Sequence, residues 1–170
     1  MSSRRDAEYS EFVAARLPSL RRLALLLCQD GAAADDVVQS AITKLYVHWN
    51  RARAADHLDA YARKIVVREF LHERRSGWAR RVLMPGTLPE RAAAAADHDA
   101  VLDLRTAVAA LPPGQRAVLV LRFYCDLNVD QAARELGCSP GNVKSQTARA
   151  LASLRRTLGP AGTREVADHG

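Results

Sequence analysis

Apolar residues recur along most of the chain at the three- and four-residue spacing of amphipathic helices, and we find no convincing β-type alternation. In the first half, this pattern predicts helices near Ser10–Cys28, Ala33–Trp49 and Leu58–Arg75, with a short further piece around Trp78–Leu83. We therefore expect an all-α fold.

The second half shows the same periodicity after a break in composition. Residues Met84–Ala96 contain two prolines followed by an alanine run, which is typical of a linker. The helices predicted beyond it are one that starts near Asp99 and stops at Leu111-Pro112-Pro113-Gly114, then Gln115–Tyr124, Val129–Leu136 and Pro140–Leu158. The sequence thus predicts two small helical domains, residues 6–82 and 101–159, joined by a flexible linker over residues 83–100.

The last two predicted helices have the spacing of a helix-turn-helix, because only Gly137-Cys138-Ser139 separates them. Gly137 suits a left-handed turn position, Ser139 can cap the following helix, and Pro140 suits its first turn. A stop signal, Gly159-Pro160, follows the second helix. We expect both helix ends to be set by this local chemistry.

The helix Pro140–Leu158 has one apolar side and one basic side. Val143, Thr147, Leu151, Leu154 and Leu158 fall within an arc of roughly 80° at 100° per residue. The polar residues opposite or beside that arc are Asn142, Lys144, Ser145, Gln146, Arg149, Arg155 and Arg156. Short polar side chains near a helix start can reach base edges while basic ones hold phosphates, and Gln146 or Arg149 could bond adenine or guanine. An ordinary solvated helix usually mixes both signs of charge, so we favour DNA binding.

Overall charge changes this picture only in part. The chain carries 25 basic and 19 acidic residues, with a sequence pI near 9.7, which favours a polyanionic partner. A GC-rich genome would also raise the arginine content, so the placement of the charges must decide. The three cysteines are not spaced as C-x-x-C, and no window has the roughly 20 apolar residues of a membrane span. We expect a cytoplasmic protein with reduced thiols and no membrane segment.

The predicted helix Leu58–Arg75 also combines an apolar arc with a basic stripe. The arc consists of Leu58, Ala62, Ile65, Val66 and Phe70, and the stripe of Lys64, Arg68, His72 and Arg75. Glu69 falls inside the apolar arc, where we expect it to pair with an arginine. Tyr61, Phe70 and Trp78 could stack on an unpaired base, although the core or its rim is the more ordinary place for them.

The predicted helix Ala33–Trp49 is acidic on its outer side. Val38, Ala41, Ile42, Leu45 and Trp49 form its buried face and leave Asp35, Asp36, Gln39 and Thr43 outside. Carboxylates in a first helical turn normally complement the helix dipole, and this explanation would suffice if no other feature were known.

Taken together, these segments resemble bacterial RNA polymerase sigma factors. Asp35-Asp36-Val37-Val38-Gln39 resembles a motif of their region 2, and Ala60–Arg75 resembles the promoter-reading helix that follows it. Leu111–Leu119 is similar to the opening of region 4, and Asn128–Leu154 to its helix-turn-helix. The short linker leaves no room for region 3, as in the extracytoplasmic-function (ECF) group, and phrases such as NVKSQTARAL are most similar to an actinobacterial branch.

The resemblance implies a sigma region 2 bundle and a sigma region 4 helix-turn-helix with separate tasks. Asp35, Asp36, Gln39 and Thr43 would dock on the β′ clamp helices of core RNA polymerase, and region 4 would meet the β flap. The −10 element would be read and melted by the loop Arg51–His57 and the helix after it, through Arg51, Arg53, Tyr61, Arg63, Lys64, Arg68, His72 and Arg75. The −35 element would be read by Ser139, Asn142, Lys144, Ser145, Gln146, Arg149, Arg155 and Arg156. An anti-sigma factor is a further implied partner. No cofactor, metal or catalytic residue is implied.

Two other classes remain open at the level of sequence. A stand-alone helix-turn-helix repressor or activator would bind operator DNA unaided, usually as a symmetric dimer. A helical adaptor would use its grooves for protein partners alone. An enzyme has little support, because the chain lacks a phosphate-binding glycine loop, a nucleophile elbow and the His/Cys spacing of a zinc site.

Overall fold

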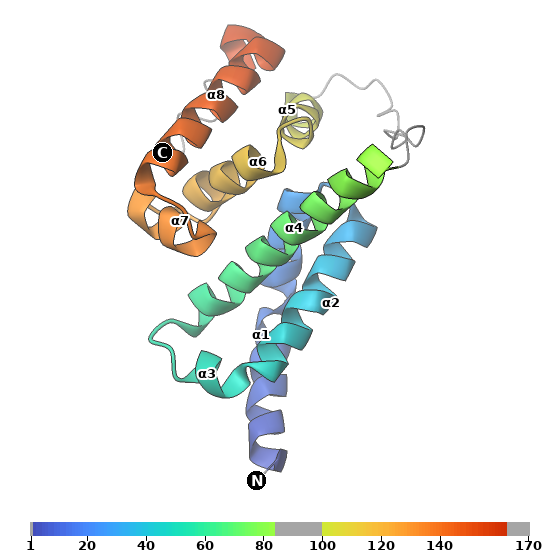
Figure 1. Cartoon of the computed structure of the whole chain (residues 1–170), viewed down its shortest axis with the longest axis vertical. Coiled ribbons are helices and arrows are strands. Elements are labelled where there is room, and N and C mark those ends of the chain that lie inside the picture. The colour runs from blue at the N-terminus through green and yellow to red at the C-terminus, as the bar shows by residue number, and fades with distance from the viewer. Residues whose placement is uncertain (1, 84–99, 163–170) are drawn as a thin grey trace. The chain divides into compact units, whose positions relative to one another are not determined.

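The computed structural model describes residues 2–83 and 100–162, in which every element is helical (Figure 1). The elements are α1 (Ser2–Cys28), α2 (Gly31–Val47), α3 (Trp49–Arg53), α4 (Leu58–Leu83), α5 (Ala100–Ala109), α6 (Pro113–Leu119), the π-helical turn η1 (Val120–Tyr124), α7 (Val129–Leu136) and α8 (Pro140–Gly162). The all-α prediction is confirmed. The chain divides into two compact units, residues 1–70 and 71–170, and α4 runs across the division. Most of the predicted linker, residues 84–99, lies outside the described residues.

In the first unit, α1 and α2 pack along each other, and the start of α4 contributes a third buried face (Figure 1). The predicted inner face of α2 is confirmed for Val38, Ala41, Leu45 and Trp49, although Trp49 belongs to α3 and Ile42 is only half-buried. Prediction missed Val37 on α2 and Val67 on α4, which are both fully buried. Both helices bury a wider arc than one apolar stripe, because each meets more than one neighbour in the bundle.

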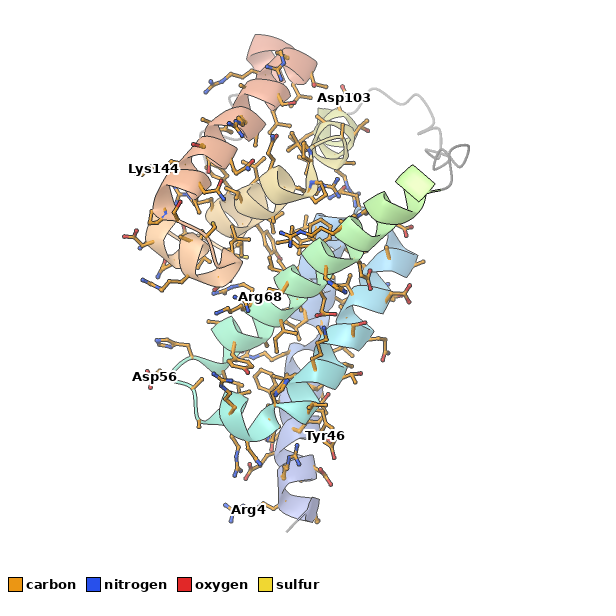
Figure 2. All side chains as sticks on the ribbon, viewed as in Figure 1. Arg4, Tyr46, Asp56, Arg68, Asp103 and Lys144 are labelled. Carbon is orange, nitrogen blue, oxygen red and sulfur yellow. The ribbon has the colours of Figure 1, made fainter. Side chains whose placement is uncertain are left out.

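Polar contacts join the ends of α1 and α2. A guanidinium nitrogen of Arg5 donates to the carbonyl oxygen of Tyr46 at 2.7 Å, and the Arg5 guanidinium lies 5.0 Å from the centroid of the Tyr46 ring. The Tyr46 hydroxyl donates to Asp6 at 2.9 Å, and the Tyr9 hydroxyl donates to the Ile42 carbonyl at 2.7 Å. Figure 2 labels Tyr46 at this end of α2. These bonds fix the helix pair in register.

Glu69 is paired with Lys44 of α2, which corrects the expectation of an arginine partner. The Glu69 side chain is 9% exposed, and its carboxylate lies 2.5 Å from the Lys44 ammonium nitrogen. A buried carboxylate requires a partner, because desolvation of an isolated charge is costly. The pair therefore ties α2 to α4 and explains an acidic residue within an apolar arc.

Four helix predictions need correction. The first helix, α1, begins at Ser2 and not near the predicted Ser10. Arg51 and Arg53 lie in α3, so the predicted loop Arg51–His57 is helical over its first part. Trp78–Leu83 is the continuation of α4, without a break after Arg75. The predicted helix Gln115–Tyr124 consists of α6 and η1, with α6 starting at Pro113 because proline fits a first helical turn.

In the second unit, α8 packs against α5, α6 and α7. One core cluster consists of Ala107, Leu111, Leu119, Ala150 and Leu154. Beside it, the buried Arg116 donates to the carbonyl oxygens of Val108, Ala109 and Leu111 at 3.2, 2.7 and 3.0 Å. Carbonyl groups at a helix end lack intrahelical partners, so this side chain closes the end of α5.

The turn between α7 and α8 has the predicted geometry. Gly137 adopts φ 67° and ψ 36°, and the Ser139 hydroxyl oxygen accepts a hydrogen bond from the backbone N–H of Asn142 at 3.1 Å. A capping box that prediction did not include starts α7: Asn128 and Gln131 each accept from the other's backbone N–H. The predicted stop is also present, because Gly159, with φ 70°, interrupts the helical path of α8.

Gly137→Ala is expected to lower the free energy of unfolding of the second unit by about 1–2 kcal/mol, because a Cβ disfavours the left-handed conformation. Gly141→Ala is the matched control. Gly141 lies in the first turn of α8, and a Cβ there would meet only the Ser139 hydroxyl oxygen at 3.9 Å. The control is therefore expected to gain about 0.5–1 kcal/mol. Chemical denaturation of both variants measures the difference, and equal effects would contradict the assignment.

Candidate functional site

The outer face of α2 presents the four polar residues that the sequence singled out. Asp35, Asp36, Gln39 and Thr43 are all exposed, while Val37 and Val38 beside them point into the core. The Thr43 hydroxyl donates to the Gln39 carbonyl at 2.8 Å, so it is bonded along its own helix. The structure brings these four side chains onto one side of a rigid element.

The position at which α2 begins does not support the helix-dipole explanation for Asp35 and Asp36. The helix starts at Gly31, and Asp30 is its N-cap, accepting a hydrogen bond from the Ala33 backbone N–H at 2.9 Å. Asp35 and Asp36 therefore lie beyond the first turn, where the dipole effect has largely faded. Asp30 already performs the capping role, so the pair of exposed carboxylates needs another reason.

Asp35 and Asp36 differ in what they contact. Arg21 of α1 lies 2.7 Å from the Asp35 carboxylate, and this hydrogen bond raises the pKa of Arg21. Both side chains of that pair are about half exposed, so the bond is worth little in stability. Among the described residues Asp36 forms no ion pair. A cationic partner would therefore find one free carboxylate and one that is already engaged.

The predicted −10 residues divide into exposed and engaged side chains. Arg51, Arg68, His72 and Arg75 are exposed, whereas Tyr61, Arg63 and Lys64 are half-buried. Figure 2 shows Arg68 projecting from α4. Phe70 is fully buried and is a core residue rather than a surface for base stacking, and the side chain of Trp78 lies outside the described ones.

Arg53 is held by α1. It lies 2.8 Å from the Glu8 carboxylate, which Arg4 also approaches at 3.3 Å. The hydrogen bond from Arg53 is the main cause that lowers the pKa of Glu8. Arg53 can contact a phosphate only if its ion pair with Glu8 is shared or broken. The exposed Arg51 on the same short helix can contact a phosphate directly.

The predicted −35 residues lie together along α8. Asn142, Lys144, Ser145, Arg149, Arg155 and Arg156 are exposed, Gln146 is half-buried, and Ser139 caps the helix. The inner face is confirmed by Val143 and Leu154, and Ala150 is a fully buried member that prediction missed. In Figure 2, Lys144 points outward from this helix.

The basic face of α8 is uncompensated within the described part of the chain. The helix contains four basic residues and no acidic one, and none of the four forms an ion pair with another described residue. A row of unpaired cations beside short polar side chains at a helix start suits a nucleic acid, because the cations can contact phosphates and the polar side chains can reach base edges.

In residues 2–83 and 100–162, no three His, Cys, Asp or Glu side chains are grouped so that they could hold a metal ion. Among the helices of those residues, none has the length and apolarity needed to cross a membrane.

Comparison with known proteins identifies both halves. Residues 12–80 match the family Sigma-70 region 2, and residues 102–154 match Sigma-70, region 4. RNA polymerase sigma-E factor of Streptomyces coelicolor is 34% identical over 156 residues, covering 89% of this chain and 86% of that protein. The ECF RNA polymerase sigma factor SigL of Mycobacterium tuberculosis is also 34% identical, covering 82% of each chain. The chain belongs to the ECF sigma factors.

As a sigma factor, the protein directs core RNA polymerase to promoter DNA. A solved structure with the same fold is the sigma factor RpoE of Bartonella quintana, crystallised in complex with the anti-sigma factor NepR. It superposes with a TM-score of 0.73 at 24% identity, covering 90% of this chain and 98% of that one. The two-region helical architecture is therefore shared over nearly the whole length.

Two residues of this sigma factor that contact the predicted sites were not predicted from the sequence. Arg21 pairs with Asp35, and Glu8 pairs with Arg53. Both lie on α1, which showed no motif, and their partners are 14 and 45 residues away along the chain. No signal in a single sequence indicates such pairs.

Proposed function

We propose that this sigma factor uses three separate surfaces, one on each of α2, α4 with α3, and α8. Asp35, Asp36, Gln39 and Thr43 dock on the β′ clamp helices of core RNA polymerase. The −10 element is read and melted by α3 and α4 through Arg51, Arg53, Tyr61, Arg63, Lys64, Arg68, His72 and Arg75. The −35 element is read in the major groove by Ser139, Asn142, Lys144, Ser145, Gln146, Arg149, Arg155 and Arg156, with the β flap as the polymerase contact of this region.

The observation that carries the proposal is the separation of unpaired charge between helices. The outer face of α2 holds one unpaired carboxylate, Asp36, and no unpaired cation, because the single lysine of α2, Lys44, is paired with Glu69. The face of α8 holds cations and no carboxylate. Opposite charges on separate rigid elements favour two different partners, a basic protein surface and a nucleic acid.

The proposed mechanism needs no reaction at a side chain of this protein. Cations on α8 and α4 displace the counterions that surround the DNA phosphates, and this release gives affinity that does not depend on sequence. Contacts to base edges then select the site, and contacts to an unstacked base stabilise the melted strand. We assign its action to the cytoplasm, where both polymerase and chromosome are found, and we propose that it contributes binding free energy and not catalysis.

An anti-sigma factor is the proposed inhibitor. The Bartonella sigma factor was solved in complex with such a protein. The same fold in this chain offers corresponding helical surfaces, so we propose a partner of that class.

Reconstituted transcription tests the function. The purified chain alone is expected to bind duplex DNA weakly, and to yield defined start sites when it is added to core RNA polymerase on genomic fragments. Run-off synthesis and mapping of 5′ ends measure this. Tight binding to a palindrome without polymerase would favour a stand-alone repressor instead, and the absence of any start site that depends on the chain would refute the proposal.

A further inference from the structure

The exposed stripe of α2 continues past the proposed docking residues to an apolar side chain. At 100° per residue, Asp36, Thr43 and Val47 fall within an arc of about 40° on the helix surface. Among the residues whose side chains the structure describes, Val47 is 65% exposed, more than the other exposed large hydrophobic ones, Leu17, Tyr46 and Tyr124. It ends α2, so the stripe runs from a carboxylate to an apolar residue.

The neighbouring Tyr46 shows why Val47 is unusual. The ring of Tyr46 packs edge-on against Tyr9 with centroids 5.0 Å apart, the Arg5 guanidinium covers it, and its hydroxyl is bonded to Asp6. Although Tyr46 is partly exposed, its ring and its hydroxyl are therefore already engaged by residues of α1. Val47 has most of its surface in solvent, and a single exposed valine would need no explanation elsewhere on the molecule.

What distinguishes Val47 is the surface between it and Asp36. The intervening residues of the stripe, Gln39, Ser40 and Thr43, are uncharged, and the cation on its flank, Lys44, is held by Glu69. The stripe is thus polar and negative at one end, neutral in the middle and apolar at the other end. Protein interfaces combine the same two parts, a desolvated apolar contact and a polar, charged margin.

We propose that Val47 is the apolar end of the docking face and is buried by core RNA polymerase, an inference that rests on the proposed docking role of α2. The polymerase surface that receives α2 then has a cationic group opposite Asp36. It also has an apolar side chain opposite Val47, about 16 Å further along the helix axis at 1.5 Å per residue. Charge complementarity sets the direction of α2 on this surface, and continuity of the stripe places Val47 inside the contact.

The two ends of the face have different kinetic roles. Charges at an interface margin act mainly on the association rate and its salt dependence. Apolar contacts form only after docking, so their loss raises the dissociation rate. Removing the apolar character of Val47 is expected to weaken polymerase binding about fivefold, through dissociation, with an unchanged salt dependence of association.

The test measures association and dissociation of the full chain with core RNA polymerase by stopped-flow fluorescence. Val47→Thr keeps the β-branched shape and adds a hydroxyl, and Val47→Ile keeps the apolar surface. Leu17→Thr is the matched control, because Leu17 is an exposed apolar residue of α1 that has no role in the proposal. Faster dissociation in Val47→Thr, with wild-type rates in Val47→Ile and Leu17→Thr, is the expected result.

A wild-type dissociation rate in Val47→Thr would overturn the inference, as would a defect seen only when the assembled holoenzyme binds promoter DNA. Asp36→Arg in the same assay separates this failure from that of the proposed function. If Asp36→Arg loses binding while Val47→Thr does not, the docking face stands and ends before Val47. If Asp36→Arg binds normally, the docking face itself is wrong. Equal thermal unfolding midpoints confirm that the variants fold.

Discussion

Asp36→Arg is expected to abolish association with core RNA polymerase and to leave the fold intact. The side chain is exposed, and among the described residues it forms no ion pair, so the substitution breaks no internal contact. A cation placed against a basic surface changes attraction into repulsion, which costs several kcal/mol, a loss in affinity of about a hundredfold or more. Fluorescence anisotropy with labelled protein measures the affinity directly.

Glu11→Arg is the control for this prediction. Glu11 is an exposed residue of α1 in the same unit, and its replacement changes the net charge by the same amount. If repulsion at the docking face is the cause, the Glu11 variant binds polymerase nearly as well as the wild-type protein. Transcription supported by Asp36→Arg at wild-type levels would show that α2 does not dock in the proposed way.

Arg149→Ala is expected to cost about 1–3 kcal/mol at a single base pair of the −35 element. Arg149 is exposed on the outer face of α8, with no acidic residue on that helix to hold it. A guanidinium that bonds guanine in the major groove discriminates between bases, so its loss relaxes preference at one position and leaves the others. Holoenzyme binding to a set of promoters that differ at each −35 position measures this preference.

Arg155→Ala is the matched variant on the same helix. Arg155 is also exposed and carries the same charge, but it lies on the flank of the basic face, where we assign a phosphate contact. Its loss should weaken all promoter sequences similarly and reduce the salt dependence of binding by about one counterion. An unchanged base preference in Arg149→Ala would remove Arg149 from the residues that read DNA.

Local features of this protein were predictable from its sequence, because neighbouring residues determine them. Gly137 and Ser139 mark the turn and the cap of α8, since one permits a left-handed backbone and the other offers a nearby acceptor. The helical period separates Val143 and Leu154 from the exposed Arg149. The bounds of α7 were predicted to the residue for the same reason.

The helix predictions that failed concern how far a pattern extends. The apolar period of the region Leu58–Arg75 gave no reason to continue the helix to Leu83, and the residues after Trp49 lacked a period long enough to indicate α3. Short helices are marginal on their own, so packing decides whether they form. Trp49 and Ala52 are both buried, which stabilises the single turn of α3.

The sequence by itself determined the all-helical fold, the faces of the helices and the acidic and basic surfaces that identify the sigma-factor regions. Only the tertiary structure decided which of those charges are free. Arg21 engages Asp35, Glu8 engages Arg53 and Lys44 engages Glu69, across separations of 14, 45 and 25 residues. The physical reason is that periodicity fixes the direction of a side chain on its own helix, whereas the residue opposite it depends on how separate helices pack.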